Sequence, residues 1–205
     1  ISNLGQTGKG YYDEDYNYAI GRLSEPGSSS KMASVLALLE DGYMDLDTKL
    51  NLYGGKKKFY DQWMYDSEMH GKTNSTLREA FEISSNVGIA SAVFKYYGKK
   101  EQRIKFANRL RDFGFYQKTT IEIEGEKAPF VKDPLKSKDW WGTTIPWMAH
   151  GYEMMQTPLQ TLNFYNAIAN DGILVKPYIV NEIIEEGKTL KAFKPVVLKK
   201  QIASI

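Results

Sequence analysis

Apolar residues recur every three or four positions in five stretches of the chain, and this period predicts α-helices. In the first stretch Met32, Val35, Leu36 and Leu39 form one apolar stripe of a buried helix, which Gly42 ends. The same pattern predicts further helices from Thr76, over residues 87–97, over residues 100–115 with Gly114 as the stop, and from Thr157.

Two of these helices carry capping residues at their start. Glu79 follows Thr76 by three positions, which is the spacing of a capping box. The last helix has Thr157 as its N-cap, Pro158 in the first turn and Gln160 at the third position, and Gly172 lies past its end.

The remaining segments predict strands, turns and loops. Residues 1–27 have short apolar pieces broken by Gly, Asn and Asp, which suits a strand end and a long loop. The lysine-rich residues 54–61 predict a solvated loop, whereas residues 173–198 predict two or three strands with a turn at 185–188. Helices in the middle and strands at the ends predict an α+β fold whose antiparallel sheet is only partly present.

Composition excludes several classes of chemistry. The chain has no cysteine, and its two histidines, His70 and His150, are far apart without a ligand-spaced neighbour, so we expect neither a metal, nor a cofactor, nor a serine-histidine-aspartate triad. A net charge of +2 gives no electrostatic case for a nucleic-acid partner. No apolar run reaches the roughly 18–20 residues that span a bilayer. Both ends look cut, so we expect a fragment of a longer protein.

The stretch "EPGSSSK" allows two interpretations. One of the three serines, Ser28 to Ser30, can cap the following helix while Lys31 lies in solvent, and spacing alone favours this. Alternatively Ser28 and Lys31 share a helix face, where a serine near the positive helix end is the nucleophile and a desolvated lysine is its base.

Three longer blocks decide between these interpretations. "YNYAIGRLSEPGSSSKMASVLALLEDG", "TLREAFEISSNVGIA" and "GYEMMQTPLQTLNFYNAIANDGILVKP" resemble successive blocks of the class B penicillin-binding proteins, the monofunctional peptidoglycan transpeptidases, and look more like the division type. The first two blocks carry S-x-x-K and S-x-N motifs in the order of that family. The resemblance covers residues 1 to 184 and implies that residues 1–205 are a partial transpeptidase domain with the family's fold, a helical subdomain plus part of a central sheet.

The resemblance also implies a role for four residues. Ser28 attacks the penultimate D-alanine carbonyl of a stem peptide or a β-lactam, and Lys31 takes its proton. Ser84 relays a proton to the leaving amine, and Asn86 binds the substrate amide and holds Lys31. The implied partners are D-Ala-D-Ala stem peptides, β-lactams and membrane proteins of division or elongation such as a glycosyltransferase. The implied location is the extracytoplasmic side of the cell envelope, with the membrane anchor outside this sequence.

Two features depart from the family pattern. Ser29-Ser30 replaces the usual Thr-Phe, which removes a packing group but no catalytic atom. The third motif, K-T-G or K-S-G, is missing, because Lys188-Thr189 is followed by Leu190 and lies in a predicted turn. We therefore expect the 205-residue fragment itself to be inactive or poorly active.

Two alternative functions stay open at this point. A serine β-lactamase or D,D-carboxypeptidase would use the same fold, and a non-catalytic β-lactam sensor or division scaffold would explain the missing motif. Among the other candidate residues, we expect Trp140, Trp141 and Trp147 to pack beneath a loop and not to form a stacking platform. We expect His150 to be structural.

Overall fold

The computed structural model describes residues 4–68 and 70–204, which divide into two compact units. Unit 2 comprises Ser24–Tyr116 and Phe130–Met155. Unit 1 comprises the described parts of Ile1–Leu23, Gln117–Pro129 and Gln156–Ile205. Each unit therefore collects segments that are distant in the sequence.

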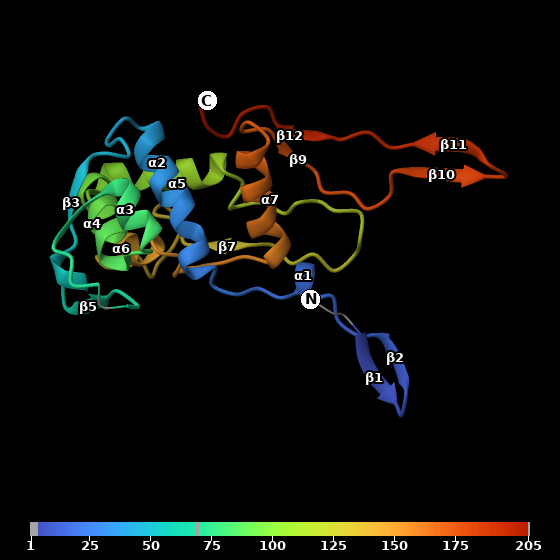
Figure 1. Ribbon diagram of the computed structural model, residues 1–205, viewed down its shortest axis with the longest axis horizontal. Coiled ribbons are helices and arrows are strands. Elements are labelled where there is room, and N and C mark those ends of the chain that lie inside the picture. The colour runs from blue at the N-terminus through green and yellow to red at the C-terminus, as the bar shows by residue number, and fades with distance from the viewer. Residues whose placement is uncertain (1–3, 69, 205) are drawn as a thin grey trace. The chain divides into compact units, whose positions relative to one another are not determined.

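Unit 2 is built around helices that lie together (Figure 1). A short 3-10 turn, Gly27–Ser30, leads directly into the first of them. The helices are α2 (Lys31–Glu40), α3 (Leu77–Glu82), α4 (Asn86–Tyr97), α5 (Lys100–Asp112) and α6 (Thr144–Met148). The helices predicted from periodicity are confirmed within a few residues, and the capping box of Thr76 and Glu79 is present at the start of α3.

Helix α4 is the centre of unit 2, because it packs against each of the other four helices. It is buried along most of its length, with Val87, Ile89, Ala90, Val93 and Tyr97 removed from solvent. Burial of this many apolar side chains fixes both the position and the rotation of the helix. The residues at its N-terminus, where the S-x-N motif lies, are fixed with it.

The predicted buried stripe of α2 is correct only for Val35. Met32, Leu36 and Leu39 are only partly buried, whereas the other buried positions of the helix are Lys31, Ala33, Ser34, Ala37 and Leu38. Small side chains let neighbouring elements approach closely, and the Ser34 hydroxyl donates to the carbonyl of Ala149 at 2.8 Å. The helix is apolar on most of its surface, so periodicity alone did not show which face the core prefers.

The lysine-rich segment is a β-hairpin, so the prediction of a solvated loop is wrong. Strand β4 (Lys56–Phe59) pairs antiparallel with β5 (Gln62–Tyr65), and Phe59 and Met64 point into the core while Lys56 and Lys58 are exposed. Lys56 lies 4.5 Å from the centre of the Trp63 ring, so the lysines cover aromatic faces. The other pairs of unit 2 are β3 (Lys49–Asn51) with β6 (Asn74–Thr76), and β7 (Phe130–Val131) with β8 (Met154–Met155).

Unit 1 holds one long helix and three strand pairs. Helix α7 (Pro158–Ala169) starts at the predicted capping box of Thr157 and Gln160, and it packs against α1 (Tyr18–Gly21) and β9 (Leu174–Val175). The pairs are β1 (Leu4–Gly8) with β2 (Tyr11–Glu14), β9 with β12 (Val197–Lys199), and β10 (Glu182–Glu185) with β11 (Lys188–Ala192).

Lys188 and Thr189, the incomplete match to the third motif, open β11 and are exposed. Thr189 donates to the Glu182 carboxylate across the hairpin at 2.8 Å. In residues 4–68 and 70–204 the strands form six antiparallel pairs, which agrees with the α+β prediction. Within those residues no helix is both long and apolar enough to cross a membrane.

Candidate active site

Ser28 differs from its two serine neighbours in what its hydroxyl contacts. Ser29 donates to the carbonyl of Pro26 at 2.7 Å, and Ser30 donates to the carbonyl of Gly27 at 2.9 Å. Ser28 is exposed, and within the described residues its hydroxyl has no hydrogen-bond partner. Ser30 occupies the N-cap position of α2 without a capping bond from its side chain. The interpretation of this cluster as helix caps is therefore wrong, and Ser28 is the serine that presents a free hydroxyl.

Lys31 is buried, with only 1% of its surface exposed. Its backbone N–H donates to the carbonyl of Ser28, which fixes the two residues one turn apart. Its ammonium group donates to the Ser84 carbonyl and, at 2.9 Å, to the Ser84 hydroxyl. The interpretation of Lys31 as a solvent-exposed residue is wrong.

Burial lowers the pKa of Lys31 from 10.5 to about 8, although the negative charge of Asp66 opposes this shift. A low-dielectric environment disfavours the ammonium form. At neutral pH roughly a tenth of such a group is unprotonated, which is enough for it to act as a general base.

Ser84 lies in a strained turn between α3 and α4. Its φ of +54° is in the left-handed region, where glycine is the usual residue. The N–H of Ser84 donates to Phe81 O and the N–H of Ser85 donates to Ala80 O, which together form a Schellman motif at the end of α3. This turn directs both the carbonyl and the hydroxyl of Ser84 at Lys31.

Ser85 and Asn86 begin α4. Ser85 is fully buried and accepts the N–H of Gly88 at 2.8 Å, so it is the N-cap. The amide of Asn86 donates to the carbonyl of Tyr65 at 2.8 Å. The implied contact of Asn86 with Lys31 is thus replaced by contacts from Ser84, and Asn86 instead ties the motif to strand β5.

Asp66 is a residue of this site that sequence reasoning missed. Its buried carboxylate accepts the Ser85 hydroxyl at 2.9 Å, the N–H of Val87 at 2.8 Å and, at 2.6 Å, the Nε2 of His70. A carboxylate at a helix N-terminus satisfies free N–H groups and complements the helix dipole. His70 is four positions away, whereas Ser85 and Val87 are 19 and 21 positions away, a separation with no recognisable pattern in one sequence.

The segment after α6 packs directly against the turn that carries Ser28. The carbonyl of Gly151 accepts the N–H of Gly27 at 3.1 Å. Gly151 has a φ of +90°, and a Cβ added there would lie 2.1 Å from the carbonyl oxygen of Gly27. Only glycine fits at this approach, so Gly151 fixes the backbone that precedes Ser28.

His150 is buried beside this turn. Burial, with a further contribution from the charge of Lys31, lowers its pKa to about 4. Within the described residues its Nε2 has no hydrogen-bond partner, and its ring lies against Tyr152 and Trp147. The imidazole is therefore neutral near Lys31, which avoids a second positive charge at the site.

Ser28, Lys31 and Ser84 are thus a candidate acyl-transfer constellation, in which Ser28 lies one turn before Lys31 and Lys31 contacts Ser84. Within the described residues there is no group of three or more acidic, histidine or cysteine side chains placed to hold a metal ion. The geometry supplies an exposed hydroxyl, a buried amine of lowered pKa and a second hydroxyl in contact with that amine.

Comparison with known proteins gives one family. The model of the penicillin binding protein transpeptidase domain matches residues 2–205. Penicillin-binding protein PbpB of Mycobacterium tuberculosis is 31% identical over 175 residues, which are 82% of this chain and 23% of the relative. Peptidoglycan D,D-transpeptidase FtsI of Buchnera aphidicola is 28% identical over 158 residues, 77% of this chain and 26% of the relative.

Solved structures agree with this assignment. Penicillin binding protein 3 of Mycobacterium tuberculosis, complexed with aztreonam, has a TM-score of 0.76 and 28% identity, over 94% of this chain and 41% of that chain. The chain spans about a quarter of the length of the curated relatives it matches. The resemblance found in the sequence motifs is confirmed, and the chain belongs to the penicillin-binding protein transpeptidase domain family.

Proposed function

We propose that the protein is a serine D,D-transpeptidase that cross-links peptidoglycan stem peptides, of the class B division type, and that residues 1–205 are part of its transpeptidase domain. The observation that carries this proposal is the free hydroxyl of Ser28, one turn from the buried Lys31 that Ser84 holds. The names of the relatives PbpB and FtsI support it.

In the first step Ser28 Oγ attacks the carbonyl carbon of the penultimate D-alanine. Unprotonated Lys31 accepts the hydroxyl proton, and the bond from that carbonyl to the terminal D-alanine nitrogen breaks. The leaving nitrogen takes a proton from Lys31 through the Ser84 hydroxyl, which lies 2.9 Å from the ammonium. The products are an ester on Ser28 and free D-alanine, and Lys31 is again neutral.

In the second step an amine of another stem peptide attacks the ester carbonyl. The new amide bond forms, the ester C–O bond breaks, and a proton from the amine returns to Ser28 through the same lysine. A β-lactam enters only the first step, because its ring amide opens without releasing a separate leaving group.

Asn86 is proposed to bind the amide backbone of the substrate, and the N–H of Ser28 to supply one oxyanion-hole donor. One N–H of the Asn86 amide bonds Tyr65 O, and the proposal assigns its Oδ1 and its other N–H to the substrate. The second donor and the anchor for the substrate carboxylate belong to the K-T-G motif. Its absence from this sequence supports the prediction that the 205-residue chain alone acylates poorly.

The function assigns a place and partners to the protein. A peptidoglycan transpeptidase works on the extracytoplasmic side of the cytoplasmic membrane, where we place this domain, with an anchoring segment outside the given sequence. The proposed partners are D-Ala-D-Ala stem peptides, β-lactams and a membrane glycosyltransferase of division or elongation.

Labelling with a fluorescent penicillin tests the proposal on the intact protein. We expect stable labelling that Ser28→Ala and Lys31→Met abolish. Ser29→Ala is the matched control and should label normally, because the Ser29 hydroxyl is tied to Pro26. Labelling that survives Ser28→Ala would refute the assignment of the nucleophile, and rapid turnover of nitrocefin would identify a β-lactamase instead.

The same label tests the role of the missing motif. We expect the 205-residue chain, once shown to be folded, to label far more slowly than the intact protein. Equally fast labelling would show that the residues described here complete the acylation site without the third motif.

A further inference from the structure

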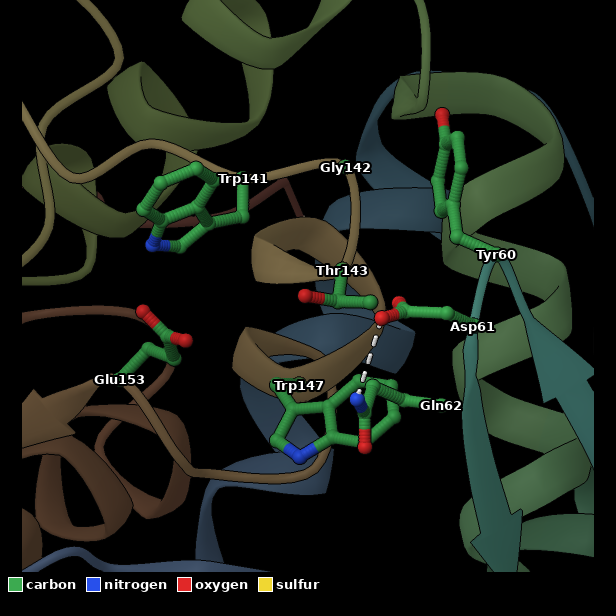
Figure 2. A pocket seen from close by; sticks show the side chains of 8 residues that line it. All are labelled: Tyr60, Asp61, Gln62, Trp141, Gly142, Thr143, Trp147 and Glu153. Atoms are coloured by element: carbon green, nitrogen blue, oxygen red, sulfur yellow. Dashed lines mark hydrogen bonds between the residues drawn. The ribbon is translucent and has the colours of Figure 1, made fainter.

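A pocket of about 570 Å³ opens in unit 2 and is not part of the acyl-transfer constellation. Figure 2 shows Tyr60 and Asp61 facing Trp141 and Glu153 across it, with Thr143 and Trp147 between them. The residues that line it come from the β4–β5 turn, the loop before α6, α6 itself and the segment after it: Tyr60, Asp61, Gln62, Trp141, Gly142, Thr143, Trp147 and Glu153. Its volume is that of an ordinary small-ligand site.

Two aromatic rings of the pocket are held out in solvent. Trp141 is 64% exposed and Tyr60 is 61% exposed. The prediction that the tryptophans pack beneath a loop is therefore wrong for Trp141. Two exposed rings that line the same pocket leave their faces available to a ligand.

The backbone of the pocket is built to hold these groups. Tyr60 has a φ of +54° in the two-residue turn of the hairpin, and Glu153 has a φ of +61°, both in the left-handed region. A Cβ on Gly142 would lie 2.6 Å from the Tyr60 ring, so the absence of a side chain there lets the ring lie flat on the loop. The ring also contacts Phe94 edge to face, with 5.9 Å between centroids.

One of the two carboxylates of the pocket is compensated by a cation. The carboxylate of Glu153 forms an ion pair with Lys132, so its charge is compensated. Asp61 accepts the amide of Gln62 at 3.3 Å, and this pair leaves free acceptors and donors at the rim (Figure 2). Aromatic faces together with a carboxylate and an amide at the rim suit a sugar, which presents C–H groups on its ring faces and hydroxyls at its edge.

The pocket shares a segment with the nucleophile turn. Glu153 follows Gly151, which contacts Gly27, by only two residues, and its N–H donates to the carboxylate of Glu25 at 3.2 Å. Two Cα–Cα steps of about 3.8 Å separate Glu153 from Gly151, and one separates Gly27 from Ser28. With the contact between the two glycines, Glu153 lies within about 16 Å of Ser28. An extended peptide of five residues covers a similar length.

We propose that this pocket is a saccharide subsite, which takes N-acetylated hexosamine units of the glycan strand whose stem peptide reacts at Ser28. The identity of the strand rests on the proposed function, whereas the affinity for the sugar rests only on the pocket. Trp141 and Tyr60 stack on the sugar faces, and Asp61, Gln62 and Thr143 bond its edges.

The test is a titration of the intact protein with chitotetraose, followed by saturation-transfer NMR and tryptophan fluorescence. We expect saturable binding that Trp141→Ala weakens by about tenfold, the loss of one stacked ring. Trp63→Ala is the matched control, because Trp63 is also an exposed tryptophan but lies in the β4–β5 hairpin outside the pocket. Maltotetraose should bind more weakly than chitotetraose, because it lacks the acetamido groups.

Three results would overturn the subsite: no saturation with chitotetraose, equal binding by Trp141→Ala, or saturation by n-butylamine that Asp61→Asn abolishes. The last result would identify an ammonium site instead. Penicillin labelling is measured on the same samples. Chitotetraose binding without labelling would refute the proposed function and leave the subsite standing, and labelling without chitotetraose binding would do the reverse.

Discussion

Lys31→Met is expected to make the protein more stable and catalytically inactive. Methionine fills nearly the same volume as the lysine stem and brings no charge into the core. Lys31 is 1% exposed and its pKa is lowered from 10.5 to about 8, so the folded protein disfavours the ammonium form that dominates at neutral pH. The substitution removes this cost.

The pKa shift gives the size of the effect. The difference of two and a half units corresponds to about 3 kcal/mol at 1.36 kcal/mol per unit. Methionine loses the bonds that Lys31 donates to Ser84, which contribute about 1 kcal/mol. At pH 7 we therefore expect the free energy of unfolding of Lys31→Met to exceed that of the wild type by about 2 kcal/mol.

The dependence on pH separates this effect from packing. Between pH 8 and 10.5 the unfolded chain keeps the Lys31 proton while the folded protein has released it, so wild-type stability rises with pH across this window. The variant lacks this contribution. The difference in the free energy of unfolding between the two proteins should therefore change by about 3 kcal/mol from pH 8 to 10.5, in favour of the wild type.

Urea unfolding of both proteins at several pH values measures this difference. Burial raises the pKa values of Tyr97 and Tyr116, but both tyrosines are present in both proteins and their effect cancels. Lys99→Met, on the surface, controls for the exchange of lysine for methionine. A constant difference across the pH range would refute the lowered pKa. The wild-type rate of penicillin acylation should also rise with pH through about 8.

Four further predictions concern the residues around Lys31. Ser84→Gly and Ser84→Ala should both lose acylation. Urea unfolding should find Ser84→Gly about 1 kcal/mol more stable than Ser84→Ala, because the φ of residue 84 is +54°. Gly151→Ala should slow acylation by about a hundredfold through displacement of the nucleophile turn, whereas Gly125→Ala, with positive φ and open space, should not. Asp66→Asn should lower the unfolding free energy by about 2 kcal/mol through weaker capping of α4, and equal stability would contradict this role. NMR titration should find His150 neutral from pH 5 to 8, since its pKa is about 4. The unfolded chain takes up this proton at a pKa of 6.5, so the free energy of unfolding should decrease as pH falls from 6.5 towards 4.

Sequence reasoning succeeded where the signal is local. Capping residues and terminal glycines located the helices, and the Thr76 and Thr157 capping boxes are both present. Spacing alone favoured a helix cap at Ser28 to Ser30, and the resemblance of three longer blocks to one family selected Ser28 and Lys31. The structure adds the reason for choosing Ser28 over Ser29, which is the internal hydrogen bond of the latter.

The failures have physical causes of another kind. Asp66 contacts residues about twenty positions away, and such a contact leaves no period in the sequence. The 56–59 strand was hidden because only Phe59 marks its inward face, and Lys56 covers rings of the partner strand. Trp141 looked like a core residue since tryptophan is mostly apolar, but the adjacent Gly142 and Tyr60 build a pocket that leaves it exposed.

Two costly features lie beside Ser28, and α4 compensates for them. A buried lysine and a left-handed serine are each unfavourable, and local sequence preference would not select them. They persist because α4 is buried against four other helices and Asp66 fixes its N-terminus. Substitutions at Lys31 and Ser84 are therefore expected to raise stability and lower activity, because they relieve strain. A substitution at Asp66 is expected to lower both, because it releases the helix that imposes the strain. Selection for stability alone would be expected to remove the first two residues and to retain the third.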